Sequence, residues 1–174
     1  DDADIDAALP FLVNAGIQNA GQTCSASSRI LVQRGVYDQV VARMAERYCA
    51  LRAGPALSDL SVGPLVSARQ KEIVEGFIAK GADLNLVARG QVVTDAPAGG
   101  AYVAPALFAD VPADNTLAQD EIFGPVQVII PFEDEAEALA ISNGTAYGLV
   151  ASVWTQNGAR QMRLARALRS GQVF

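Results

Sequence analysis

The sequence contains no histidine among its 174 residues. This absence excludes Ser-His-Asp triads, Cys-His dyads, zinc sites of the His-Glu-x-x-His type and pH switches based on imidazole. Cysteine is also scarce: Cys24 and Cys49 are the only two, and two cysteines without histidine do not make an ordinary structural zinc site. We therefore expect no metal, and the remaining chemistry belongs to carboxylate, thiol, lysine or tyrosine groups.

Basic residues are outnumbered, with 13 Lys and Arg against 19 Asp and Glu and a formal net charge of -6. This balance argues against sequence-independent binding of nucleic acid. The acidic N-terminus is unlike a signal peptide, and no apolar run is long enough to cross a bilayer. Two cysteines do not indicate a disulfide scaffold. We expect a cytoplasmic protein with no nucleic-acid and no membrane partner.

The chain is 51% hydrophobic and 18% charged, which is typical of a single globular domain with a large core. Spacing of apolar residues and capping residues predicts helices from Asp4 to about Ala20, Val36–Arg52, Ser67–Gly81, Glu133–Ser142 and Asn157 to about Arg169. Strands are predicted at Arg29–Gln33, Leu84–Ala88, Val126–Pro131, Gly148–Trp154 and from Val173 onward, with a loop or hairpin over Gln91–Tyr102. The strand-helix alternation of the last third requires parallel strands. The predicted fold is α/β, with a mostly parallel sheet and helices on both faces.

Charge is distributed unevenly along the last third of the chain. No Lys or Arg occurs between Gly90 and Ala159, and then four arginines follow at a spacing of three, from Arg160 to Arg169. They form either a solvated helix face or a docking surface for another domain or subunit. Among the remaining residues, Cys49 is interpreted as a small buried hydrophobe, and Tyr147 and Trp154 as core residues.

The first motif that could carry chemistry surrounds Cys24. This cysteine follows a glycine turn between a predicted helix and a predicted strand, with small residues from Ser25 to Ser28 after it. Such surroundings let a substrate approach the sulfur and leave backbone N–H groups free for an oxyanion. Taken alone, however, a cysteine in a turn is more often inert than nucleophilic.

The second motif is the segment Asp120–Pro125, directly before the strand predicted at Val126–Pro131. One of the adjacent carboxylates, Asp120 or Glu121, could accept both hydroxyls of a ribose, and Phe123 could supply an apolar wall for a flat ring. The alternative is a solvated acidic turn in which Phe123 fills a gap in the core.

Together the two motifs resemble the catalytic domain of the NAD(P)-dependent aldehyde dehydrogenase superfamily. Asn-Ala-Gly-Gln-Thr-Cys at 19–24 is similar to the active-site cysteine motif of that family, and Glu-Ile-Phe-Gly-Pro-Val at 121–126 to its cofactor-contacting motif. The 97-residue separation of Cys24 and Glu121 also fits. Further similarities are Asp2–Asp6, Gly63-Pro64, Asn143–Leu149 and Ser170–Val173, so the resemblance runs nearly end to end.

The resemblance implies an enzyme that oxidises an aldehyde to a carboxylic acid with NAD or NADP. Cys24 would be the catalytic nucleophile and would form a thiohemiacetal and then a thioester. Glu121 would bind the nicotinamide ribose, Phe123 would pack near the nicotinamide, and Gln70 would lie near the same ribose.

Members of this family are much longer than 174 residues. We therefore expect residues 1–174 to be the cysteine-bearing catalytic domain, with the dinucleotide-binding domain, the general-base glutamate, the oxyanion asparagine and a C-terminal segment outside it. On this interpretation the isolated chain is inactive and its parent is a homodimer or homotetramer. The alternative is a truncated, non-catalytic paralogue that serves as a protein-interaction module. A generic thiol-redox protein is disfavoured because the sequence has no Cys-x-x-Cys.

Overall fold

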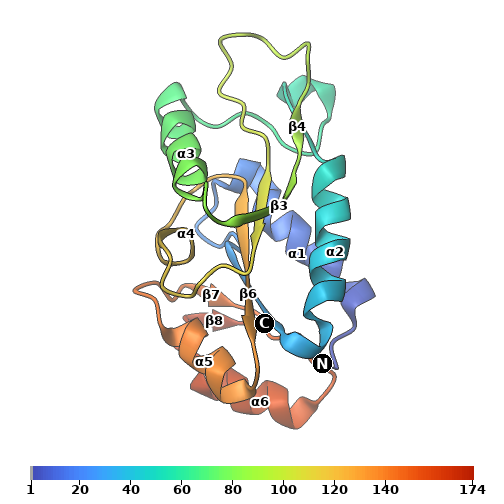
Figure 1. The fold of residues 1–174 in the computed structure, drawn as a ribbon, viewed down its shortest axis with the longest axis vertical. Coiled ribbons are helices and arrows are strands. Elements are labelled where there is room, and N and C mark those ends of the chain that lie inside the picture. Colours follow the sequence, from blue (N-terminus) through green and yellow to red (C-terminus); the bar gives the residue numbers. More distant parts are fainter. Residues whose placement is uncertain (1) are drawn as a thin grey trace.

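The computed structural model describes residues 2–174, which form a central four-stranded sheet with helices on both faces (Figure 1). The sheet has the strand order β1-β6-β5-β3. Its members are β1 (Arg29–Gln33), β6 (Val126–Phe132), β5 (Ala106–Ala109) and β3 (Asn85–Arg89). β1, β6 and β5 run parallel, and β3 is antiparallel to β5. The predicted α/β fold with a mostly parallel sheet is confirmed.

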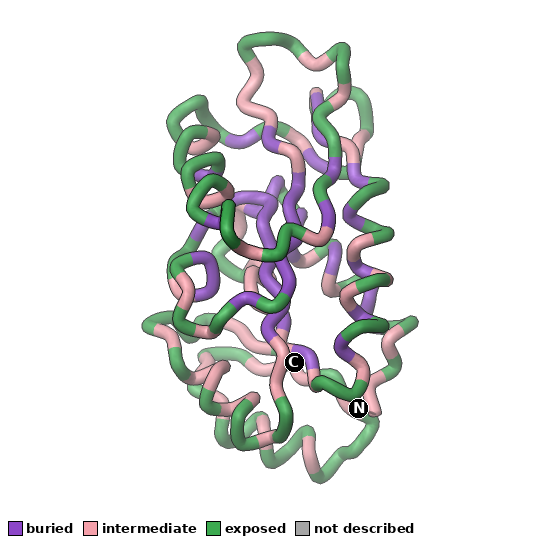
Figure 2. The backbone as a smooth tube through the Cα atoms, in the orientation of Figure 1, coloured by how far each residue is buried: buried purple, intermediate pink, exposed green. Residues whose placement is uncertain are grey.

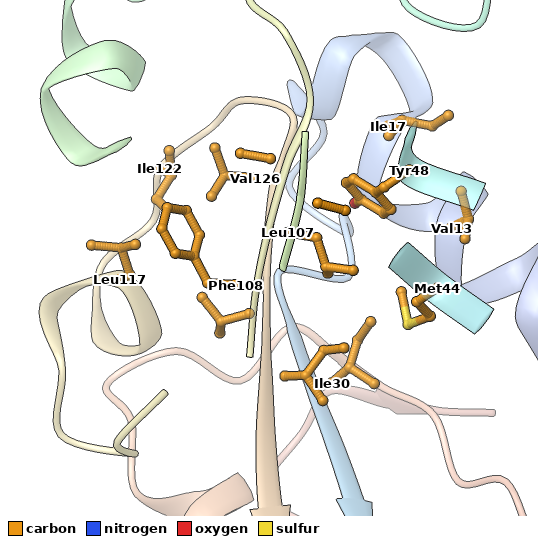
Figure 3. Close-up of a cluster of buried hydrophobic side chains, with 14 of the residues drawn as sticks. Val13, Ile17, Ile30, Met44, Tyr48, Leu107, Phe108, Leu117, Ile122 and Val126 are labelled. Atoms are coloured by element: carbon orange, nitrogen blue, oxygen red, sulfur yellow. The ribbon is translucent and has the colours of Figure 1, made fainter. Parts of the chain in front are cut away.

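β6 is one of the two inner strands of the sheet, and its first five residues are all buried. A run of this kind is typical of a strand covered on both faces. Beside it lies β5, also buried throughout, which the sequence analysis did not predict. Neighbouring residues of β5 serve opposite layers: Leu107 points toward Met44 and Tyr48, whereas Phe108 points toward Leu117 and Ile122 (Figure 3). The core is therefore continuous through the sheet.

The helices α1 (Ile5–Ile17) and α2 (Arg34–Ala50) cover one face, and α3 (Ala68–Lys80) and the short α4 (Thr116–Gln119) cover the other (Figure 1). Side-chain caps define where α1 and α3 begin. The carboxylate of Asp4 accepts from the Ala7 N–H at 3.0 Å, and the hydroxyl of Ser67 accepts from the Gln70 N–H at 3.1 Å. The helix predicted to continue to Ala20 ends at Ile17, because the backbone then turns into the left-handed region.

The last third of the chain differs from the prediction. β7 (Val150–Ala151) and β8 (Gln172–Val173) are parallel as expected, but they form a separate two-stranded sheet, and neither pairs with β6. Both edges of β6 are already occupied by β1 and β5, so no hydrogen-bonding edge of that strand is left. A third small sheet pairs β2 (Arg52–Ala53) with β4 (Gln91–Val92), the latter at the start of the predicted loop.

The helices α5 (Glu135–Asn143) and α6 (Gly158–Ala167) contain no buried residue, and Figure 2 shows this end of the molecule as mostly exposed or half-buried backbone. Ion pairs, and not a buried core, connect α6 to α5 and to the N-terminal segment. Arg163 donates to both oxygens of Glu135, each at 2.6 Å, and Arg160 lies 3.0 Å from the carboxylate of Asp2. These two arginines of the basic helix therefore have partners within the chain.

Three predictions of burial are wrong. Cys49 is exposed, because it lies off the stripe of α2 that carries the buried Tyr37, Val40, Met44 and Tyr48. Tyr147 and Trp154 are 55% and 38% exposed, and both lie outside the cluster of buried core residues. Within residues 2–174, no helix is long and apolar enough to cross a membrane.

Candidate active site

The segment that precedes Cys24 has an unusual backbone. Asn19, Ala20 and Gly21 have φ values of 50°, 56° and 73°, so three consecutive residues lie in the left-handed region. For residues with a Cβ this region costs about 1–2 kcal/mol each, although asparagine tolerates it better than most. The chain must therefore be held here by other contacts.

A reciprocal pair of amide side chains supplies those contacts. Asn19 donates through Nδ2 to the carbonyl of Gln22 at 3.0 Å, and Gln22 donates through Nε2 to the carbonyl of Asn19 at 2.9 Å. The remaining acceptor, Gln22 Oε1, takes the backbone N–H of Val66 at 2.8 Å. The left-handed turn is thus closed on itself and connected to the segment before α3.

Gly21 brings this turn against the second motif. A Cβ at Gly21 would lie 2.1 Å from the carbonyl oxygen of Gly124 and 2.8 Å from the nitrogen of Pro125. Such distances are possible only for glycine, which has no Cβ. The structure therefore brings together the two motifs that the sequence separates by 97 residues.

Gln70 holds the second motif from the side of α3. Its Nε2 donates to the carbonyl of Ile122 at 3.2 Å and to that of Phe123 at 3.0 Å. Phe123 has a φ of 54°, in the left-handed region. In this conformation the carbonyls of Ile122 and Phe123 point to the same side, so one amide group reaches both. Ser67 and Gln70 have the spacing of a capping box. The hydroxyl of Ser67 caps α3, but the Gln70 amide binds the second motif and not the start of the helix.

Cys24 itself is exposed at the tip of a turn. The turn is closed by the Ala26 N–H, which donates to the Thr23 carbonyl at 2.9 Å. The chain is then attached to α1, because the Ser27 N–H donates to the Ala15 carbonyl at 3.0 Å. Within the described residues the Cys24 N–H makes no hydrogen bond. The sulfur and a free backbone donor are thus presented together.

Glu121 and Phe123 flank the buried Ile122, and both are exposed. It is Ile122 that fills the core, at 3% exposure, whereas the ring of Phe123 is 38% exposed. The alternative in which Phe123 fills a gap in the core is therefore not observed. An exposed carboxylate and a partly exposed ring two residues apart offer a hydrogen-bond acceptor and an apolar surface. Residues 2–174 contain no group of three or more His, Cys, Asp or Glu side chains that could hold a metal ion.

Three glutamines organise this region. The sequence analysis assigned no role to Gln22 or Gln127, and it did not predict the contact of Gln70 with the second motif. The only available signal was position. Gln22 lies inside the cysteine motif, and Gln127 stands inside an otherwise apolar strand.

Comparison with protein-family models matches residues 1–174 to the aldehyde dehydrogenase family. The chain is 40% identical to the 5-carboxymethyl-2-hydroxymuconate semialdehyde dehydrogenase of Escherichia coli, over all of the chain and 38% of that protein. Among solved structures, it superposes with a TM-score of 0.98 and 55% identity on a Burkholderia cenocepacia protein assigned to the aldehyde dehydrogenases, covering 99% of this chain and 37% of that one.

A Mycobacterium tuberculosis aldehyde dehydrogenase complexed with NAD+ gives a TM-score of 0.93 at 41% identity, covering 99% of this chain and 36% of that one. The chain thus spans little more than a third of the length of these relatives. Because the family match extends over all 174 residues, the chain belongs to the aldehyde dehydrogenase family.

Proposed function

We propose that residues 1–174 are the cysteine-bearing catalytic domain of a longer NAD(P)-dependent aldehyde dehydrogenase, which oxidises an aldehyde to a carboxylic acid. The observation that carries this proposal is the contact of Gly21 with the Gly124 carbonyl, because it places the Cys24 turn beside the segment of Glu121 and Phe123. A nucleophile and a candidate cofactor contact then share one region of the surface.

Cys24 is the nucleophile in this proposal. Its thiolate attacks the aldehyde carbon, the C=O π electrons move to oxygen, and a thiohemiacetal forms. The free Cys24 N–H is a donor for the developing oxyanion, since no other group of the described residues uses it. After oxidation to the thioester, the Cys24 sulfur is the leaving group when water attacks and the acid is released.

Glu121 and Phe123 form the proposed contact with the cofactor. The residues present fit the nicotinamide riboside end, because the exposed carboxylate can accept the ribose hydroxyls and the exposed ring can lie near a flat heterocycle. When bound, the nicotinamide supplies the hydride acceptor that turns a thiohemiacetal into a thioester. The structure of an NAD+ complex in the family supports this type of cofactor. In this proposal the choice between NAD and NADP belongs to a dinucleotide-binding domain outside residues 1–174.

The longer parent is proposed to contribute the general base, the second oxyanion donor and the contacts of a homodimer or homotetramer. Coverage of 36–38% of the relatives supports this division. Two free, exposed cysteines suit a reducing compartment, in line with a cytoplasmic enzyme. The 174-residue chain alone is then expected to show no NAD-dependent dehydrogenase activity.

The test begins with the DNA directly upstream of the Asp1 codon. An in-frame dinucleotide-binding domain ending in Glu-Leu-Gly-Gly supports the proposal, and a start codon close to Asp1 contradicts it. In the full-length protein, Cys24→Ala should abolish turnover while NAD still binds. The matched control is Cys49→Ala, which removes the other exposed thiol and should keep the rate. Turnover by the Cys24→Ala variant would refute the nucleophile assignment. Cys24-dependent reduction of NAD by the isolated chain would refute the expected inactivity of that chain.

A second candidate is the non-catalytic interaction module. It is supported by exposed apolar side chains, among them Phe11 at 65%, Leu149 at 50% and Phe174 at 76%. Such residues would be covered either by a separate partner protein or by further domains of the longer parent. The upstream sequence separates the two candidates, because only the module reading expects a short gene.

A further inference from the structure

Gln127 is the single buried polar residue of the part of the chain that the structure describes, at 0% exposure. It lies in β6, two residues after Pro125, and is surrounded by apolar strand residues. A primary amide in such a place is costly unless each of its hydrogen-bonding groups finds a partner. Its retention in the middle of the sheet therefore needs an explanation.

The amide of Gln127 is fully engaged. Nε2 donates to the carbonyl of Leu12 at 3.0 Å and to that of Ser27 at 2.5 Å, while Oε1 accepts from the hydroxyl of Tyr48 at 2.5 Å. Tyr48 is itself buried, and burial raises its pKa, so the hydroxyl stays protonated and donates. A fully satisfied network in a low-dielectric interior is rigid and favours one arrangement.

Gly16 makes room for this network. A Cβ at Gly16 would lie 2.1 Å from Cδ and 2.4 Å from Nε2 of Gln127. The amide thus rests directly on the backbone of α1, which lets it reach the Leu12 carbonyl.

Both backbone polar groups of Ser27 are held as a result. The Ser27 N–H donates to the Ala15 carbonyl at 3.0 Å, and the Ser27 carbonyl accepts from Gln127. Ser27 lies three residues after Cys24, at the return of the turn that carries the sulfur. The left-handed turn fixes the chain before Cys24, and Ser27 fixes it afterwards.

We propose that Gln127, together with Tyr48, is a positioning residue for Cys24: by holding the Ser27 carbonyl it keeps the cysteine turn in the geometry for attack. The inference rests on the proposed function, since it takes Cys24 to be the nucleophile. Neither residue touches substrate or cofactor in this proposal; both act through the backbone of the turn.

The experiment uses the full-length protein and measures the first turnover of NADH formation with aldehyde and NAD in excess over enzyme, so that the amplitude counts the active molecules and the rate constant reports how fast they react. Gln127→Met keeps the length of the side chain and removes all three hydrogen bonds. The rate constant should fall by about 10- to 100-fold, the range expected when a reacting group is displaced by roughly 1 Å. The NADH amplitude and the Kd for NAD should stay near wild type. A merely structural role would lower the amplitude, because fewer molecules would be folded, and leave the rate constant unchanged.

Two further variants keep the test decisive if Gln127→Met does not fold. Tyr48→Phe removes one hydrogen bond and leaves the contact with Ser27, so its rate constant should fall less, by about 2- to 10-fold. Gly16→Ala displaces the amide without deleting it and should slow the same step. The rate at which iodoacetamide alkylates Cys24 should differ from that of the wild type in the same variants. It is measured without aldehyde or NAD, by mass spectrometry of the peptide that contains Cys24.

The matched control is Tyr37→Phe. Tyr37 is a second buried tyrosine of α2, and its hydroxyl oxygen accepts from the Asp110 N–H at 2.6 Å, away from the Ser27 contact. Its variant should lose stability and keep the first-turnover rate. If Tyr48→Phe and Gly16→Ala both keep the wild-type rate and alkylation while Cys24→Ala is inactive, the positioning role is wrong and the proposed function stands. If Cys24→Ala is active, both fail together.

Discussion

Replacing Gly21 by alanine should separate the two motifs of the site. The new Cβ would lie 2.1 Å from the carbonyl oxygen, 2.3 Å from the carbonyl carbon of Gly124 and 2.8 Å from the Pro125 nitrogen. All three are backbone atoms, so no side chain can rotate away to make room. Gly21 also has a φ of 73°, which an alanine adopts only with strain.

The cost follows from these two effects. Left-handed backbone costs alanine about 1–2 kcal/mol, and overpacking of a tight contact about 1–3 kcal/mol. The lower entropy of the unfolded alanine chain returns about 0.4–1 kcal/mol. Gly21→Ala should therefore lower the free energy of unfolding by about 1–4.5 kcal/mol, a large part of the roughly 5–15 kcal/mol typical of a domain.

Urea unfolding of the chain, followed by far-UV circular dichroism, measures this change. With a slope of about 2 kcal/mol per molar urea, the midpoint should fall by about 0.5–2 M. The control is Gly76→Ala in the interior of α3, where a Cβ meets no atom within 4 Å. There alanine should raise the stability by about 0.5–1 kcal/mol. A Gly21→Ala midpoint equal to that of the wild type would refute the close approach of the two motifs.

Two other expectations concern the ion pair between α5 and α6 and the contact of Gln70 with the candidate site. The hydrogen bonds and charge of Arg163, with Arg160, hold the pKa of Glu135 below its ordinary 4.5. Because the folded-state pKa is the lower one, the stabilisation is present above about pH 4.5 and is lost as the pH falls below it. Glu135→Gln should therefore lower the hydrogen-exchange protection factors of α6 at pH 6. The ratio of these protection factors to those of the wild type should approach one toward pH 3, and a ratio that stays constant would contradict the ion pair. At the site, Gln70→Ala removes two hydrogen bonds of about 0.5–1.5 kcal/mol each from the Phe123 segment and should raise the Kd for NAD about 3- to 10-fold in the full-length protein. Gln161→Ala removes a comparable bond to the Thr155 carbonyl and should leave that Kd unchanged.

The residues of the candidate site were proposed from two short motifs, each ambiguous alone, and from their joint resemblance to one family. Cys24 follows a glycine turn and has small neighbours, and Glu121 and Phe123 sit two residues apart before a buried strand; these features require no knowledge of the fold. The contact of Gly21 with Gly124 could not be predicted, since it depends on how α1, α3 and β6 pack. The orientation of the Gln70 amide, toward the motif rather than back to Ser67, depends on the same packing.

The sequence by itself determined the elements that short-range forces specify. Helix starts at Asp4, Ser67 and Asn157 follow from side chains that accept backbone N–H groups, and β6 follows from its apolar run. Even the exposure of Cys49 was contained in the stripe of α2, where the buried positions recur every three or four residues and omit it.

Only the tertiary structure decided which strands pair and which surfaces remain open. β5 gives too short a signal to be recognised until β6 and β3 are on either side of it. β7 and β8 form their own sheet because the edges of β6 are already taken, and Trp154 stays exposed there. Strand pairing and glycine contacts join residues far apart in the chain, so their energies depend on the whole packing arrangement and cannot be assigned to any one segment.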